Sequence, residues 1–252
     1  SEATQLGYLG QLQLGWQNRM FLQAAARVDQ FSTFGGDAQA FFLPKIGASY
    51  VISEESWFKL PLVSNMRLRA AWGQTGRAPT PGASLTTFSA APFVLGTGSS
   101  SGVVPNNPGN DSLRAERGEE LEVGVDWGMF RDRVNFELNW FDKVSRDLLL
   151  QQPLPPSLGF ASFPFANIGR LRNKGIEFAV NAQMIRAKDF SWDLRYTMNT
   201  LDNNVENLGR VSPFFTGNVG RIEVGLPAGA MVTKRILNIN EQTGVVQVDT
   251  AF

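Results

Sequence analysis

Residues Glu119–Phe141 read EELEVGVDWGMFRDRVNFELNWF and contain two runs in which apolar and polar residues alternate. The apolar members are Leu121, Val123, Val125 and Trp127 in the first run and Val134, Phe136, Leu138 and Trp140 in the second. A period of two is typical of a β-strand, because successive side chains point to opposite faces. The stretch therefore predicts a hairpin that turns at residues 130–133. Its apolar residues are expected to face lipid, and the opposite face is expected to carry Glu120, Glu122, Gly124, Asp126, Asn135, Glu137 and Asn139 into a lumen.

The same pattern recurs along the chain. One hairpin is predicted from 6–16 and 20–28 around a turn at 17–19, and another from 176–184 and 192–198. Single strands are predicted at 46–52 and 66–72. The total is about eight strands of about ten residues each, longer than the roughly five or six residues typical of globular sheets. Such strands match the roughly 9 to 11 residues needed to cross a bilayer at a tilt, so the sequence predicts an all-β fold, an antiparallel transmembrane β-barrel in part.

The lengths of the connections and the positions of the tryptophans favour the same fold. Short turns alternate with long polar stretches at 30–41, 76–118 and 151–172, as periplasmic turns and extracellular loops do in outer-membrane barrels. The stretch 76–118 is predicted to be a long surface loop. Five of the six tryptophans are expected in two interfacial belts: Trp16, Trp127 and Trp192 beside the short turns, and Trp72 and Trp140 toward the long loops.

Composition excludes several classes of function. The 252 residues carry 23 basic and 23 acidic side chains, and no basic run indicates a nucleic-acid partner. The chain has no cysteine and no histidine, which excludes a Ser-His-Asp triad, a histidine-ligated zinc and thiolate chemistry. We therefore predict no enzyme activity and no catalytic, cofactor-binding or metal-binding residues. No apolar run reaches 18 residues, and Ser1–Gln5 lacks the layout of a signal peptide, so a signal is expected upstream.

Three groups of residues resemble functional motifs, and each has a simpler interpretation. Gly96–Gly102 lacks the lysine and helix of a phosphate-binding loop and is predicted to be flexible. Asn106, Asn107, Asn110 and Asp111 offer oxygens but lack the spacing of a calcium loop. Glu119, Glu120 and Glu122 suggest a glycosidase pair, yet Glu120 and Glu122 share a face with Gly124 and Asp126, which a polar lumen explains. The same interpretation applies to Arg67 and Arg69.

Several stretches resemble the SusC/RagA-like branch of TonB-dependent outer-membrane transporters. They are Arg27–Phe34 (RVDQFSTF), Pro44–Glu55 (PKIGASYVISEE), Leu68–Gly76 (LRAAWGQTG), Asn110–Trp127 (NDSLRAERGEELEVGVDW), Lys143–Phe160 (KVSRDLLLQQPLPPSLGF) and Asn167–Leu194 (NIGRLRNKGIEFAVNAQMIRAKDFSWDL). They touch most of the chain from about residue 27 to 200, in the family's order.

The resemblance implies energised nutrient import across the outer membrane of a Gram-negative-type bacterium, of a glycan, an oligopeptide or a similar compound. It implies a plug inside the barrel, coupling to TonB and ExbB-ExbD, contact with outer-membrane lipids, and a SusD-like lipoprotein lid. Barrels of this kind have about 22 strands, so residues 1–252 are expected to form part of the barrel domain, with the plug and the remaining strands not present.

Two other classes of protein remain open at this point. A passive porin shares every barrel feature but lacks the plug, and a soluble β-sandwich binding module also alternates along its strands. Beyond Asn203 the periodicity weakens, and Gly217, Gly220, Gly225 and Gly229 interrupt it. The segment after Arg221 resembles a mid-barrel stretch of the family, and we interpret the aromatic end of Val245–Phe252 as coincidental rather than as a terminal barrel strand.

Overall fold

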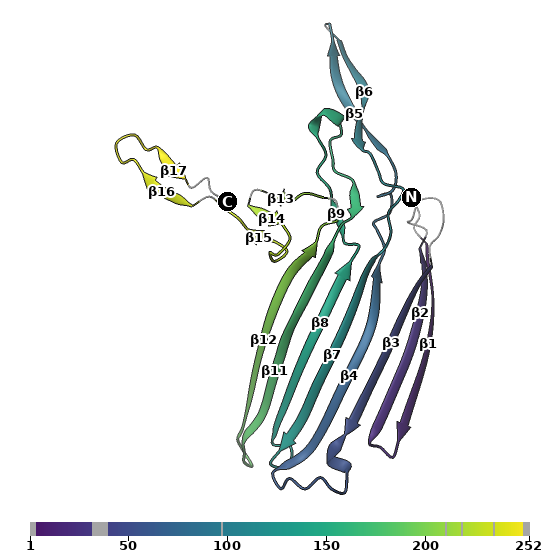
Figure 1. Cartoon of the computed structure of the whole chain (residues 1–252), viewed down its shortest axis with the longest axis vertical. Helices are drawn as coiled ribbons and strands as arrows, with labels where there is room; N and C mark the ends of the chain where they lie inside the picture. The colour runs from purple at the N-terminus through teal and green to yellow at the C-terminus, as the bar shows by residue number, and fades with distance from the viewer. Residues whose placement is uncertain are drawn as a thin grey trace.

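The computed structural model describes residues 4–31, 40–96, 98–209, 211–217, 219–233 and 235–248. Its main feature is one eight-stranded sheet, drawn in Figure 1 as a wall of long, leaning strands. The strands are β1 (Gln5–Trp16), β2 (Met20–Phe31), β3 (Ala40–Val51), β4 (Val63–Arg77), β7 (Glu116–Met129), β8 (Val134–Arg146), β11 (Arg170–Arg186) and β12 (Ser191–Asn207). Each pairs antiparallel with the next in this order. All eight predicted strands are confirmed.

The strands are longer than the sequence pattern predicts, with 12 to 17 residues each. The alternation of apolar residues ends before the hydrogen-bonded pairing of the strands ends. Beyond Trp140, for example, β8 continues through Asp142 to Arg146 and stays paired with β7 and β11. Charged side chains that pair across the strands replace the apolar ones in this region, so a hydrophobicity pattern does not detect it.

The tryptophans lie along the strands partly as predicted, with those beside the short turns in place and Trp140 away from the long loops. Trp16 ends β1, Trp192 lies near the start of β12, and Trp127 pairs with Met66 and Phe136 close to the turn. Trp72 lies toward the opposite end, paired with Leu121. Trp140, by contrast, lies at the middle of β8, where it pairs with Val123 and Ile176. It still marks the end of the apolar run, because the next residue on its face is Asp142.

The connections at one end of the sheet are short, as predicted. Gln17 and Asn18 adopt positive φ of 52° and 55°, which gives a tight hairpin turn between β1 and β2. Phe130, Arg131 and Asp132 also adopt positive φ between β7 and β8. The connection from β3 to β4 contains a 3₁₀ helix, η1 (Ile52–Glu54).

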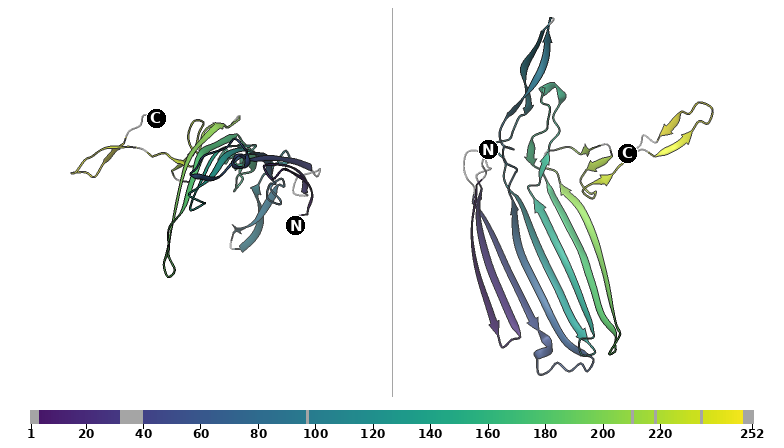
Figure 2. Two further views of the ribbon diagram at one scale, coloured as in Figure 1. Left: turned by 90° about the horizontal axis from the view of Figure 1, so that it is seen from below. Right: turned by 180° about the vertical axis from the view of Figure 1, so that it is seen from behind.

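The connections at the other end are long and structured. Between β4 and β7 the chain forms a hairpin of β5 (Thr87–Leu95) and β6 (Gly98–Asn107), which projects beyond the wall (Figures 1 and 2). The stretch 76–118, predicted to be a long surface loop, therefore contains a hairpin, and its predicted bounds are wrong for Gly76, Arg77 and Glu116–Gly118, which extend β4 and β7. Between β8 and β11 lie β9 (Leu149–Gln151), η2 (Pro156–Leu158) and β10 (Phe165–Asn167). Predicted loop residues 32–39 lie outside the described residues.

After β12 the chain forms only short strands. They are β13 (Phe214–Thr216), β14 (Gly220–Ile222), β15 (Ala230–Met231), β16 (Ile236–Ile239) and β17 (Val246–Val248). None joins the eight-stranded sheet, and β17 pairs with β16. The last four residues, 249–252, lie outside the described residues. Among those that are described, no helix is long and apolar enough to cross a membrane.

The two faces of the sheet differ in chemistry. One face, here the apolar face, carries side chains such as Leu14, Leu22, Val123 and Leu194 that are 45 to 52% exposed. Among the described strands, no second sheet packs on it as the second layer of a β-sandwich would. Most of the buried residues lie instead near the long connections, where Ile168, Val205, Leu208 and Ile222 form the main cluster.

Candidate functional site

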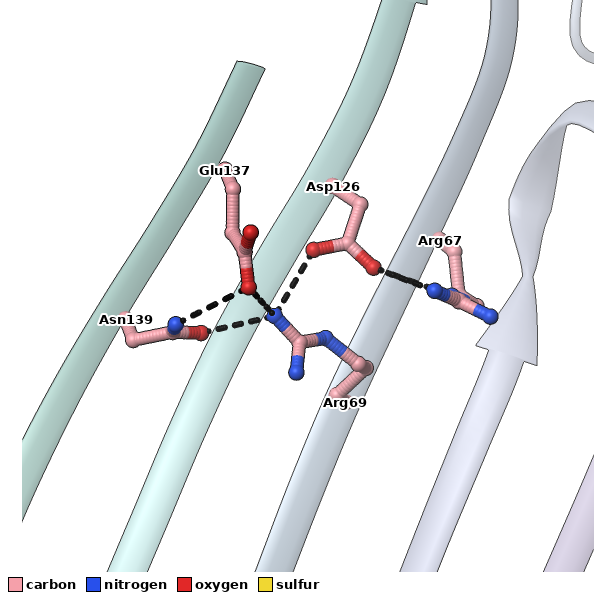
Figure 3. Close-up of polar contacts among 5 residues, drawn as sticks. All are labelled: Arg67, Arg69, Asp126, Glu137 and Asn139. Carbon is pink, nitrogen blue, oxygen red and sulfur yellow. Dashed lines mark hydrogen bonds and ion pairs between the residues drawn. The ribbon is translucent and has the colours of Figure 1, made fainter. Parts of the chain in front are cut away.

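The opposite face, here the polar face, carries a network of charges that spans β4, β7 and β8 (Figure 3). The residues are Arg67, Arg69, Asp126, Glu137 and Asn139, and this set is the charge network below. Arg67 donates from Nε and Nη2 to Asp126 Oδ2 at 3.0 and 2.7 Å. Arg69 binds the other oxygen of the same carboxylate at 2.8 Å. The predicted placement of Arg67 and Arg69 with Asp126 and Glu137 on one face is confirmed.

Arg69 is the centre of the charge network. Its Nη2 lies 2.8 Å from Asp126 Oδ1, 2.9 Å from Glu137 Oε1 and 2.8 Å from Asn139 Oδ1. Two guanidinium and two carboxylate groups make the network neutral. Charge-assisted hydrogen bonds of this kind are stronger than neutral ones. Because the charge network joins three strands, it stiffens the wall where there is no apolar core.

Two glycines make room for these polar contacts. A Cβ on Gly124 would collide with Asn139 Oδ1 and lie 3.3 Å from Arg69 Nη2. A Cβ on Gly128 would lie 2.6 Å from Asn65 Nδ2, which donates to Asp132 at 2.6 Å. Glycine at both positions therefore lets side chains of the neighbouring strands lie flat across the sheet.

The three carboxylates that suggested a glycosidase pair lie in different surroundings. Glu120 makes an ion pair with Lys143 at 3.3 Å on the polar face. Glu119 lies on the other face, where it accepts a hydrogen bond from the Trp72 indole at 3.1 Å and pairs with Arg146 at 3.3 Å. Glu122 lies two residues from Glu120 along β7, and no ion pair involves it among the described residues. Each carboxylate therefore has a structural environment of its own.

A belt of ion pairs crosses the apolar face where its hydrophobic residues end. Arg172 donates from Nε to Asp142 Oδ1 at 2.8 Å and also reaches Glu206. Arg170 binds Glu206 at 2.9 Å, and Lys174 binds Asp202 at 3.2 Å. Hydrophobic alternation does not predict this belt. The signal was present as alternating basic residues at 170, 172 and 174.

The asparagine cluster considered for calcium links two long connections to each other. The Asn106 backbone oxygen accepts from Ser162 N at 2.8 Å, and Asn110 Nδ2 donates to Phe165 O at 2.9 Å. Asn107 Oδ1 accepts from Gly109 N at 2.8 Å. These oxygens and amides hold loops together. Within the described ranges, no group of three or more acidic side chains is arranged to hold a metal ion.

Asn167 is the centre of this link between loops, a role that no sequence pattern indicates. Its Oδ1 accepts from Arg114 N at 2.7 Å, and its Nδ2 donates to Arg114 O at 2.7 Å and to Asp147 O at 2.9 Å. Arg114 and Asp147 also form an ion pair at 3.0 Å. The segments before β7 and after β8 therefore form one body above the sheet.

The chain belongs to the TonB-dependent receptor-like β-barrel family, whose model matches residues 1–249. Members of this family are proteins of the outer membrane of Gram-negative bacteria. The chain is similar to a TonB-dependent receptor of Formosa agariphila, with 31% identity over 206 residues that cover 81% of this chain and 21% of that receptor. It is also similar to the TonB-dependent receptor SusC of Bacteroides thetaiotaomicron, with 29% identity over 213 residues, again 81% and 21% of the two chains.

Solved structures share the fold. A structure of the RagAB peptide transporter superposes with a TM-score of 0.85 at 20% identity, over 97% of this chain and 27% of that one. The siderophore receptor PirA of Pseudomonas aeruginosa gives a TM-score of 0.54 at 18% identity, over 80% and 35% of the two chains. The resemblance to SusC/RagA-like transporters and the all-β barrel fold are thereby confirmed. The chain spans about a fifth of the length of the curated relatives it matches.

Proposed function

We propose that residues 1–252 form part of the barrel wall of an outer-membrane importer that takes up a nutrient with energy supplied through TonB. The observation that carries this proposal is the pair of unlike faces on one uncovered sheet. The apolar face suits lipid, and the polar face, with its neutral charge network, suits a hydrated lumen. The plug and the remaining strands are supplied by residues outside this chain.

We propose that this chain catalyses no reaction. Its contribution is to the lipid-facing wall, to the lumen around the plug, and to the loops where a nutrient first binds. An oligopeptide or a glycan is the proposed class of nutrient, and RagAB, which shares this fold, is a peptide transporter. The proposed partners are outer-membrane lipids, TonB with ExbB-ExbD, and a SusD-like lipoprotein. We propose no cofactor and no nucleic-acid partner.

The competing function is that of a passive porin, and energy dependence separates the two. Uptake of labelled oligopeptides and oligosaccharides is measured in cells that express the full-length protein, with and without a functional TonB. If the protein is an importer, uptake is expected to stop when TonB is removed or a protonophore is added. Uptake that continues unchanged under both conditions would establish a porin instead.

A further inference from the structure

Three arginines lie side by side on the apolar face, beyond the end of its hydrophobic residues. Arg117 on β7 is the cross-strand partner of Arg146 on β8, and Arg146 is in turn the partner of Arg170 on β11. Alternation along the strands places them on the same face as Leu121 and Trp140. These three residues are the arginine row below. Like charges directly opposite one another destabilise a sheet, so the row needs compensating negative charge.

The carboxylates near the arginine row compensate it only in part. Arg146 makes an ion pair with Glu119 at 3.3 Å, and Arg170 makes one with Glu206 at 2.9 Å. Glu206 also binds a further arginine of β11. Arg117 makes no ion pair within the part of the chain that the structure describes. The side chains of Arg146 and Arg170 remain 53 and 42% exposed, and Arg117 is exposed as well. The row therefore presents positive charge to an anion outside the wall.

The arginine row lies just beyond the hydrophobic part of the apolar face. Leu121 ends the apolar run of β7, and Arg117 lies four residues away, about 14 Å along the strand. At a tilt of about 40° this corresponds to about 10 Å of depth, and a long arginine side chain bends toward the membrane across part of it. The ion pair of Arg172 with Asp142 lies between and is balanced. The guanidinium groups therefore reach the layer of lipid headgroups at the end of the sheet that carries the long connections.

We propose that the arginine row binds a phosphate group of a lipid in the outer leaflet, whose acyl chains lie on the apolar residues below the row. Guanidinium groups bind phosphate oxygens through paired, charge-assisted hydrogen bonds. A free phosphate ion meets the same guanidinium groups but gains nothing from Leu121, Val123 and Trp140, which are 40 to 46% exposed on the same face. The continuity of the row with this apolar surface therefore favours a lipid. The inference rests on the proposed function, because only a membrane-spanning wall places this face against lipid.

The test measures how tightly the full-length protein binds a phosphorylated lipid. Purified protein in detergent micelles is titrated with diphosphoryl lipid A, and native mass spectrometry gives the dissociation constant of the first lipid bound. Arg117→Gln and Arg146→Gln are each expected to raise that constant about tenfold, as the loss of one charge-assisted hydrogen bond predicts. Lipid A without its phosphates is expected to bind the unsubstituted protein at least as weakly as the phosphorylated lipid binds these variants.

Arg77→Gln is the matched control for the arginine row. Arg77 ends β4 and pairs with Glu116, the residue before Arg117, but alternation turns its side chain to the polar face. The variant loses the same charge at the same height of the wall, so it is expected to leave the dissociation constant unchanged. Arg117→Gln breaks no ion pair within the described ranges. A loss of lipid binding in that variant therefore reports on the site and not on a broken pair.

Four results overturn the inference. Two are equal dissociation constants for the unsubstituted protein and both row variants, and equal constants for the two forms of lipid A. The third is displacement of the lipid by inorganic phosphate at a similar concentration, which shows a site for the ion alone. The fourth is arginine-dependent binding of polyglutamate without binding of lipid A, which shows an acidic protein partner. All four leave TonB-dependent uptake untouched, whereas a full-length protein that does not fractionate with the outer membrane removes the proposed function and this inference together.

Discussion

The Asn139 side chain lies across Gly124, with its Oδ1 so close to the place of a Cβ on that glycine that the two atoms would clash. The same oxygen accepts a hydrogen bond from Arg69 Nη2 at 2.8 Å. Gly124 therefore determines the geometry of the charge network, although it has no side chain of its own. The alternation of apolar and polar residues predicts only that Gly124 is a small residue on the polar face.

Replacing this glycine by alanine is expected to destabilise the barrel. The added methyl group in Gly124→Ala displaces Asn139 and meets the Leu138 backbone oxygen, 3.2 Å from the ideal Cβ position. Crowding of this kind costs about 1 to 3 kcal/mol. Reversible unfolding of the full-length protein in lipid vesicles measures the change. Gly47→Ala is the matched control, because its nearest neighbour would be 3.7 Å away. A larger loss for Gly47→Ala would contradict the assigned role of Gly124.

Removing the Asn167 side chain is expected to loosen the two linked loops. Asn167→Ala deletes three hydrogen bonds of 2.7 to 2.9 Å, two to the exposed backbone of Arg114 and one to the part-buried carbonyl of Asp147. A local loss of about 1.4 kcal/mol corresponds to about tenfold faster amide exchange. Hydrogen exchange followed by mass spectrometry is expected to show faster exchange in peptides covering 107–115 and 147–169.

Asn106→Ala is the matched control for the loop experiment. Asn106 reaches the opposite loop through its backbone oxygen at 2.8 Å, and its own side chain makes only contacts of 3.4 to 3.5 Å. Exchange is therefore expected to stay near that of the unsubstituted protein. Equal acceleration in both variants would show that Asn167 is not the centre of the link between the loops.

The ion pairs at the end of the apolar face are expected to differ in strength. A double-mutant cycle with Arg172→Ala and Asp142→Ala is expected to give a coupling energy of about 1 kcal/mol, because two hydrogen bonds join these partly buried groups. The exposed pair Lys174 and Asp202 is expected to give less than about 0.5 kcal/mol. Unfolding in vesicles supplies both values. Equal coupling energies in the two cycles would mean that the paired hydrogen bonds of Arg172 do not strengthen its interaction with Asp142.

The long connection between β4 and β7 is expected to be accessible outside the cell. Protease added to intact cells is expected to cleave within 76–118, and the structure narrows the site to the projecting hairpin of β5 and β6. Phe88, Val94 and Val103 there are 62, 78 and 73% exposed, so the hairpin offers side chains to a protease. Cleavage that occurs only after the protease is admitted to the periplasm would show that this connection faces the periplasm and not the outside of the cell.

The sequence predicted the strands because alternation is a local property. It found all eight strands of the sheet, and it placed Arg67, Asp126 and Glu137 on one face, because one face of a strand must follow a period of two. Strand ends were less accurate, since charged residues such as Asp142 and Arg172 continue the ladder without a hydrophobic signal.

Contacts between segments that are distant in the sequence could not be predicted from hydrophobic alternation. Asn167 meets Arg114 across 53 positions of sequence, and only the pairing of β7 with β8 and β8 with β11 brings them together. The packing of Asn139 over Gly124 likewise depends on cross-strand register. Hairpin β5–β6 was missed because Gly, Ser and Pro dominate it, residues that usually indicate irregular structure.

Arginine substitutions on β7 are expected to measure depth in the membrane. Val123 pairs with Trp140 near the middle of the apolar face, and arginine on a lipid face at mid-depth costs roughly 2 to 4 kcal/mol. Trp127 lies beside the short turn, where that penalty falls toward zero. Its ring stacks on Phe136 at 4.9 Å, and losing such a contact costs about 0.5 to 1.5 kcal/mol. Val123→Arg is therefore expected to destabilise the barrel more than Trp127→Arg.

Gly124→Arg completes this series on the polar face. Alternation alone predicts that it affects transport or plug fit more than folding, because a wet lumen tolerates charge. The position of Asn139 adds a steric cost, so we expect a loss of stability smaller than that of Val123→Arg, together with a clear loss of transport. Reversible unfolding of the three variants in vesicles, with uptake measured in cells, tests the order. A buried tryptophan in a soluble sandwich would leave the largest cavity, so finding Trp127→Arg the most damaging would falsify the lipid-facing assignment of this hairpin.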